Sequence, residues 1–313
     1  MRDLQRRLGT AGFPPTGAEV GAFCVSTEHT LREFQRVRHL PVTGECDEVT
    51  WTALVEASYR LGDRLLKLTS PHTRGDDVAQ LQARLGRLGF DCGKVDGIYG
   101  PQTDRALQRF QRDCGLAPDA VCGAETIRLL DGFLRQSGEG PGVAALRERE
   151  RFERSTRTLE GRRVVLGQFG GASTITRTAA RLLRPAGALV VQLDEADARA
   201  QAQTSNEFEA DLYVGLTLTD EPGFMVAYYA VPGFESAAGR TMAQQLAAAL
   251  ASRRVAPHTD VIGLRHPVLR ETRMPAVLVT CGPVRPVMDC ASQLASAVAD
   301  AITGWCLHIS MST

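Results

Sequence analysis

The apolar positions between residues 74 and 134 recur at the three-to-four-residue spacing of amphipathic helices. They fall into three groups, which are Val78, Leu81, Leu85 and Leu88, then Ala106, Leu107 and Phe110, then Ile127, Leu129 and Leu130. The stretch 90–100, between the first two groups, contains Asp96-Gly97, a dipeptide typical of turns. The pattern therefore predicts a small all-α module of three short helices.

The same pattern occurs earlier in the chain. Leu4-Gln5 is repeated as Leu81-Gln82, 77 positions later, and Phe34-Gln35 is repeated as Phe110-Gln111, 76 positions later. Self-similarity at a nearly fixed spacing indicates a duplicated structural unit. We therefore predict two copies of the three-helix module.

From residue 161 onward, short apolar runs alternate with helical stretches. Strands are predicted over 163–166, 188–193, 211–218, 224–231 and 275–281, and helices over 174–183, 196–209, 242–250 and 294–302. This alternation is typical of an α/β domain with a mainly parallel or mixed sheet flanked by helices. The fold class is therefore multidomain, with two small all-α modules and one α/β domain.

Four segments follow from these patterns. They are module 1 over residues 1–57, module 2 over 74–134, a linker over 135–160 and the α/β domain over 161–309. The linker is rich in glycine and then in charge, which is typical of a solvated segment. The stretch from Tyr59 to Arg74 is mixed and polar, and we expect it to be a connector between the modules.

Composition narrows the class of protein. The 313 residues include 36 Lys+Arg and 36 Asp+Glu, a balance that argues against a nucleic-acid partner. No apolar run approaches the ~18 residues of a membrane span. The N-terminal sequence MRDLQRRLGTAGF lacks the apolar segment of a secretory signal, and the eight cysteines are too few for a disulfide scaffold. We expect a cytoplasmic protein.

Several positions of the second repeat match a known module. They are Leu81-Gln82, Leu88-Gly89-Phe90, Val95-Asp96-Gly97, Tyr99-Gly100, Thr103, Ala106, Phe110-Gln111, Gly115-Leu116 and Thr126. The repeat resembles the type-1 peptidoglycan-binding module of bacterial wall hydrolases. Module 1 is a worn copy, with Phe23-Cys24 where module 2 has Tyr99-Gly100. If ligand binding is retained, the resemblance implies glycan contacts at Asp96, Gly97 and Tyr99; the alternative is that these residues specify only the fold.

Two segments of the α/β domain also match a family. They are Ala210–Val214 (ADLYV) and Val268–Val279 (VLRETRMPAVLV), accompanied by Arg199 and Asn206. The domain resembles the zinc-dependent N-acetylmuramoyl-L-alanine amidases of type 3. The resemblance implies a zinc ion held by His, Glu and His, with a further Glu as general base.

The residues that would perform this chemistry are absent. Phe169 stands where the resemblance places the first zinc histidine, in the loop Gln168-Phe169-Gly170-Gly171, and Thr217 stands in place of the second. Thr280 takes the place of the general base, and residues 166–193 contain no Asp or Glu for the acidic ligand. We therefore predict a vacated site at Gln168, Phe169, Thr217 and Thr280, with no catalytic residue, no metal and no cofactor.

Three functions stay open at this point. The order of domains, and the segments 56–64 and 75–85, resemble a family of actinobacterial amidase homologues. That resemblance implies a cytoplasmic regulator of peptidoglycan precursor synthesis, acting on UDP-N-acetylglucosamine enolpyruvyl transferase under a Ser/Thr kinase. The alternatives are a sensor that binds muropeptides and an amidase with relocated zinc ligands, for which Cys281, Cys290 and His266 are the candidates.

Overall fold

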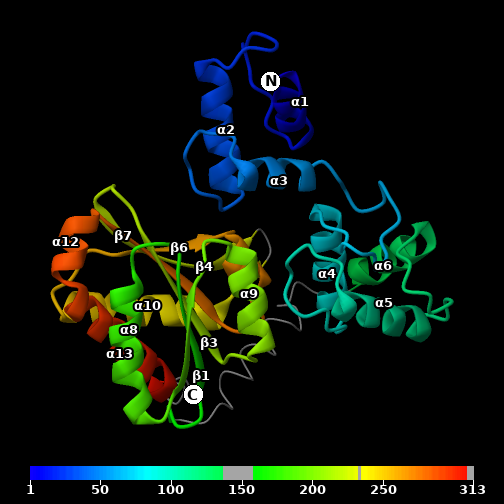
Figure 1. The fold of residues 1–313 in the computed structure, drawn as a ribbon. Coiled ribbons are helices and arrows are strands. Elements are labelled where there is room, and N and C mark those ends of the chain that lie inside the picture. The colour runs from blue at the N-terminus through cyan, green and yellow to red at the C-terminus, as the bar shows by residue number, and fades with distance from the viewer. Residues whose placement is uncertain (137–157, 232–233, 309–313) are drawn as a thin grey trace. The chain divides into compact units, whose positions relative to one another are not determined.

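The computed structural model describes residues 1–136, 158–231 and 234–308, which divide into a helical unit and an α/β unit (Figure 1). The helical unit contains both repeats. Module 1 consists of α1 (Arg2–Thr10), α2 (Val25–Val37) and α3 (Glu48–Glu56), and module 2 has α4 (Asp76–Arg87), α5 (Pro101–Asp113) and α6 (Ala124–Gln136). The prediction of three helices in each copy is confirmed.

Each module has its own hydrophobic core. Leu8, Leu31 and Phe34 are buried in the core of module 1, and Leu81 and Phe110 are buried in that of module 2. The apolar residues that repeat along the sequence are therefore the residues that hold each set of three helices together, as expected for amphipathic helices.

The glutamines of the repeated Leu-Gln and Phe-Gln pairs hold the loops between the helices. In each, the side-chain carbonyl oxygen accepts a hydrogen bond from a backbone N–H of a loop. The pairs, all with 2.8 Å between Oε1 and N, are Gln5 with Gly21, Gln35 with Gly44, Gln82 with Gly97 and Gln111 with Ala120. Gln35, Gln82 and Gln111 are buried. A loop whose N–H groups cannot reach water needs such partners, which explains why these glutamines recur.

The segment from Tyr59 to Arg74 is part of module 2, so the prediction of a connector is wrong. Leu66 is fully buried in the core of module 2. Its backbone pairs with that of Cys122, with 2.8 Å from Cys122 N to Leu66 O. Isolated leucines among polar residues gave no periodic signal, although one of them fills a core position.

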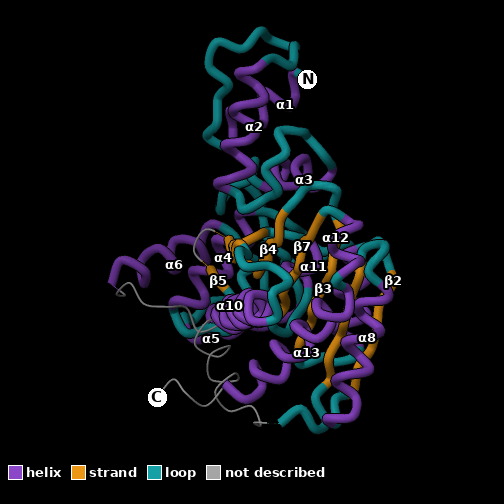
Figure 2. The backbone as a smooth tube through the Cα atoms, turned by 90° about the vertical axis from the view of Figure 1, so that its left-hand side faces the viewer, coloured by secondary structure: helices purple, strands orange, loops and turns teal. Residues whose placement is uncertain are grey.

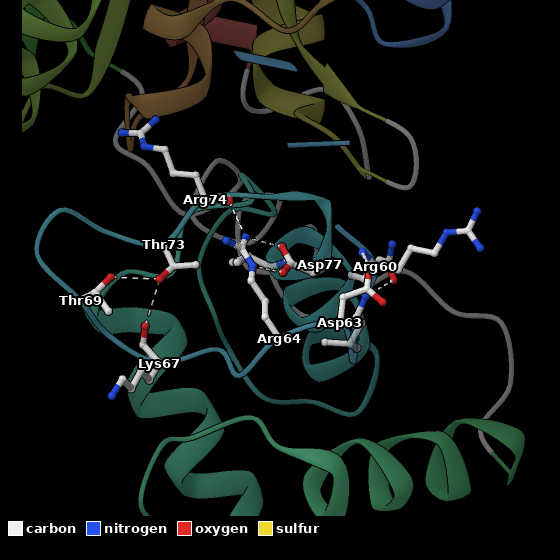
Figure 3. Close-up of polar contacts among 11 residues, drawn as sticks. Arg60, Asp63, Arg64, Lys67, Thr69, Thr73, Arg74 and Asp77 are labelled. Carbon is white, nitrogen blue, oxygen red and sulfur yellow. Dashed lines mark hydrogen bonds and ion pairs between the residues drawn. The ribbon is translucent and has the colours of Figure 1, made fainter. Parts of the chain in front are cut away.

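An ion pair fixes the same segment to α4 (Figure 3). Nε of Arg64 lies 2.6 Å from Oδ2 of Asp77, and Nη2 lies 3.0 Å from Oδ1. Nη2 also donates to the backbone oxygen of Arg74 at 2.7 Å, and the guanidinium lies 3.9 Å from the centre of the Tyr59 ring. The hydrogen bonds to buried Asp77 raise the pKa of Arg64 above its usual value.

The α/β unit contains one mixed sheet. Its strands are β1 (Arg163–Gln168), β2 (Leu189–Asp194), β3 (Leu212–Leu218), β4 (Gly223–Val231), β5 (Phe234–Glu235), β6 (Asp260–Leu264) and β7 (Ala276–Gly282). The order is β2-β1-β3-β7-β4-β5, with β6 paired to β4. Strands β2, β1, β3 and β7 are parallel, while β4 runs antiparallel to β7. Figure 2 shows β4, β7, β3 and β2 following one another across the sheet. The predicted fold class is confirmed, but β5 and β6 were not predicted.

Helices cover both faces of this sheet. On one face, α8 (Ser173–Leu183), α10 (Ala237–Ser252) and α13 (Ala291–His308) pack together over the alternate residues Leu212, Val214 and Leu216 of β3. On the other face, α9 (Ala198–Glu207) packs against α11 (Pro267–Glu271), and Gln201 of α9 contacts Tyr213. The remaining short helices are Arg184–Ala186 (η1) and α12 (Val284–Asp289). None of the helices in the described ranges is both long and apolar enough to cross a membrane.

Candidate functional site

The predicted vacated site lies where three parallel strands end. The backbone N–H of Phe169, directly after β1, donates to Leu216 of β3 at 3.1 Å. Thr217 of β3 is paired in register with Thr280 of β7. Because residues opposite each other on paired strands share a face, the two threonine side chains project from the same face of the sheet. The structure thus brings together residues far apart in the sequence.

The donor set at these strand ends does not fit zinc. Phe169 is half-buried, and its ring packs edge-on against the His266 ring, with 5.8 Å between centroids. An aromatic hydrocarbon ring has no lone pair for a metal. Thr217 and Thr280 are half-buried and offer only neutral hydroxyls, which are neither ordinary zinc ligands nor bases at neutral pH.

The candidates for relocated ligands do not form a substitute site. Burial lowers the pKa of His266 to about 4, and its Nδ1 accepts a hydrogen bond from Val268 N at 3.3 Å, so the ring is neutral at pH 7. Burial raises the pKa of the Cys281 thiol to about 12. Within the described ranges, no three His, Cys, Asp or Glu residues are grouped so that they could hold a metal ion.

Gln168 shapes the loop after β1. Its side chain is buried, and Oε1 accepts hydrogen bonds from Gly170 N at 2.8 Å and Ala172 N at 3.1 Å. Its Nε2 donates to Ser173 Oγ at 3.3 Å and to the carboxylate of Asp194. Both ends of the amide are therefore engaged in ordering the turn into α8.

A cavity opens beside this loop, and we call it the β1–β2 pocket. It has a volume of about 300 Å³ and is lined by Gln168, Ser173, Thr176, Arg177, Gln192, Leu193 and Asp194. Only Gln168 had been singled out from the sequence. Asp194 could have indicated this pocket from the sequence, because it is a carboxylate at the end of a predicted parallel strand. Ligands of open α/β sheets bind at the carboxyl ends of the strands.

Arg199 and Asn206 of α9 contact the second amidase-like segment, residues 268–279. Nδ2 of Asn206 donates to Glu271 O at 2.8 Å, and Oδ1 accepts from Arg273 N at 2.8 Å. Arg199 pairs with the Glu271 carboxylate at 3.5 Å. These contacts fasten α9 to the segment before β7, so both residues support the fold in this structure.

The candidate glycan residues of module 2 form a tightly hydrogen-bonded turn. Oδ1 of Asp96 accepts from Gln82 Nε2 at 2.9 Å and from Ile98 N at 2.8 Å. Gly97 is buried and has a φ of 70°, a backbone conformation that favours glycine. Tyr99 has no exposed surface, and its hydroxyl donates to Ala120 O at 2.6 Å. This burial contradicts a direct contact between the Tyr99 ring and a glycan, since the ring fills the core.

Comparisons with known proteins agree with this architecture. The family described as "Putative peptidoglycan binding domain" matches residues 1–54 and 74–130, one stretch in each repeat. The chain is 34% identical to N-acetylmuramoyl-L-alanine amidase CwlM of Mycobacterium tuberculosis over 313 residues, covering 90% of this chain and 76% of that protein. It is 31% identical to the amidase CwlL of Bacillus licheniformis over 157 residues, 43% of each chain.

Among solved structures, the amidase Ami1 of Mycobacterium smegmatis is similar to 48% of this chain and 98% of its own, with 15% identity and a TM-score of 0.41. The similarity to CwlM extends through both the modules and the α/β unit, and it covers more than two thirds of that relative. The chain therefore belongs to the CwlM family, in which peptidoglycan-binding modules are joined to an amidase-like domain.

Proposed function

We propose that this chain is a non-catalytic amidase homologue that acts in the cytoplasm as a regulator or scaffold of peptidoglycan precursor synthesis. The observation that carries this proposal is the set of side chains at the neighbouring strand ends, which are those of Phe169, Thr217 and Thr280. A hydrolase of this type needs a metal to polarise the amide and to activate water. An aromatic ring and two neutral hydroxyls supply neither function.

Metal content and hydrolysis test the absence of catalysis. The full chain, purified without chelator, is expected to carry far less than one equivalent of zinc and to release no peptide from muramoyl-peptides. The amidase CwlL, treated identically, serves as the positive control. One equivalent of zinc together with peptide release would overturn the proposal.

The regulatory part of the proposal is tested separately. We propose UDP-N-acetylglucosamine enolpyruvyl transferase as the protein partner and a Ser/Thr kinase as the controlling enzyme. Addition of the full chain to the purified transferase of the same organism is expected to raise its rate, and phosphorylation of the chain by the kinase is expected to change that effect. An unchanged rate, together with no complex between the two proteins in a pull-down, would reject this partner.

A muropeptide sensor is the second candidate, supported by the family match in both repeats. Calorimetry with soluble muropeptides is expected to show binding that weakens in Asp96→Ala, because this carboxylate shapes the loop through Ile98 N. Asp113→Ala, exposed at the end of α5, is the matched control. No heat at about 1 mM ligand would exclude the sensor, since it leaves less than about 4 kcal/mol of binding free energy.

A further inference from the structure

The β1–β2 pocket shares Gln168 with the predicted vacated site, and its other six lining residues are different. It is formed by the carboxyl ends of β1 and β2 and the first turn of α8. Its volume of about 300 Å³ is at the low end of the ~300–1,000 Å³ typical of small-molecule sites. Six of its seven lining residues are polar or charged, so any ligand is small and polar.

Two of the lining residues, Arg177 and Gln192, offer hydrogen-bond donors. Arg177 is exposed, and its Nε donates to Ser173 O at 3.2 Å. In the part of the chain that the structure describes, its two terminal nitrogens have no partner. Gln192 is half-buried, and its side-chain amide likewise has no partner among the described residues. A guanidinium beside an amide N–H is a suitable pair of donors for a carboxylate.

A third lining residue, Asp194, offers an acceptor held in place. The carboxylate of Asp194 accepts from Ser173 Oγ at 3.0 Å and from Nε2 of Gln168, whose side chain is buried. Each carboxylate oxygen keeps further lone pairs for a ligand. Over residues 1–136, 158–231 and 234–308, no Lys, Arg or His pairs with Asp194, so its charge is uncompensated within the fold.

We propose that the β1–β2 pocket binds a small zwitterion, either a free α-amino acid or a dipeptide. Arg177 and Gln192 bind the carboxylate of the ligand, and Asp194 binds its ammonium group. The opposite charges of Arg177 and Asp194, which line the same pocket, match the opposite charges of the ligand, and the volume holds one or two residues. This site does not require zinc and does not depend on the regulatory function proposed above.

Ligands that lack one charge test the proposal on the full chain. Calorimetry is expected to show binding of alanine or of alanyl-alanine, and the stronger of the two identifies the source as free amino acid or peptide. Alanine amide lacks the carboxylate and N-acetylalanine lacks the ammonium, and each is expected to bind at least tenfold more weakly. Equal binding of inorganic phosphate would make this a simple anion site and would overturn the proposal.

Variants locate the binding. Arg177→Gln is expected to weaken binding at least tenfold, whereas Arg181→Gln, exposed one turn further along α8 and outside the pocket, leaves it unchanged. Asp194→Asn is expected to weaken binding by the same factor as Arg177→Gln. If this variant fails to fold because Ser173 and Gln168 lose their partner, Gln192→Ala is measured in its place. Equal affinities of the Arg177 and Arg181 variants, or no binding of either zwitterion at about 10 mM, would reject the site.

Discussion

At the scale of single residues, glutamine side chains hold the loops between the helices of both modules. Gln82 spans a loop with both ends of its amide, accepting from Gly97 N and donating to Ile98 O at 3.1 Å and to Thr103 Oγ1 at 3.1 Å. Few other side chains can donate and accept at this length without carrying a charge. In the repeated Leu-Gln and Phe-Gln pairs, the apolar residue therefore recurs because of helix periodicity, and the glutamine recurs because of its hydrogen bonds.

The hydrogen bonds of Gln82 lead to a prediction about the free energy of unfolding. Gln82→Ala leaves the buried Gly97 N–H without its acceptor and is expected to cost about 1–3 kcal/mol of the free energy of unfolding. Urea unfolding of the full chain measures the loss in the transition of the helical unit. Gln102→Ala, exposed on α5, is the control and should change little. Equal losses in both variants would show that the hydrogen bonds of Gln82 contribute nothing.

His266 makes the stability of the α/β unit depend on pH. Its pKa in the folded protein is about 4, below the ordinary value of 6.5, so the unfolded chain binds more protons between these pH values. Stability is therefore expected to fall as pH decreases from about 6.5 toward 4, by up to about 3 kcal/mol. His266→Asn keeps a capping acceptor for Val268 N and should flatten this dependence. Exposed His258→Asn is the control, and an equally steep profile in both variants would contradict the assignment.

At the scale of elements, the sequence allowed every long helix and five strands to be predicted, and the exceptions have physical reasons. Strand β6 is short, contains Gly263 and buries only Leu264, so it carries no alternation of apolar and polar residues. The segment 59–74 joins module 2 through buried Leu66, the Arg64–Asp77 ion pair and backbone hydrogen bonds such as that between Leu66 and Cys122. The β1–β2 pocket requires β2 to lie beside β1, with α8 packed on β2, and this arrangement is tertiary. Local periodicity does not encode such contacts.

The ion pair of this segment can be tested at the same scale. Arg64→Met removes the partner of Asp77, whose side chain is only 1% exposed, and leaves a buried carboxylate uncompensated. Removing one partner of a fully buried ion pair lowers the free energy of unfolding by about 3–5 kcal/mol. A loss of about 2 kcal/mol is expected here because Arg64 is partly exposed. Urea unfolding measures the loss, and limited proteolysis should then cut first within residues 59–74. Arg60→Met, exposed in the same segment, should have neither effect. Unchanged stability of Arg64→Met would show that the ion pair contributes nothing and that Leu66 and the backbone hydrogen bonds hold the segment.

At the scale of the whole molecule, the α/β unit brings the ends of three parallel strands to one edge of its sheet. The register of β1, β3 and β7 places Phe169, Thr217 and Thr280 at neighbouring positions along this edge. The segments that resemble amidases hold this fold through contacts such as those of Asn206. A resemblance over these segments therefore does not by itself require zinc ligands.

Restoring the donors tests whether the architecture is competent. Phe169→His and Thr217→His restore the two histidine ligands, and Thr280→Glu restores the carboxylate of the general base. Combined in one chain, they place two imidazoles and a carboxylate on neighbouring strand ends. The triple variant is expected to retain zinc close to one equivalent after dialysis, whereas the natural sequence retains only a trace. A chain with Thr219→His in place of Thr217→His is the control, since Thr219 lies beyond the end of β3. If neither chain retains zinc, the strand ends have moved apart as well as lost their ligands. Zinc retention without hydrolysis would show that the fold positions the two imidazoles and that amide cleavage also needs the acidic zinc ligand, for which residues 166–193 offer no Asp or Glu.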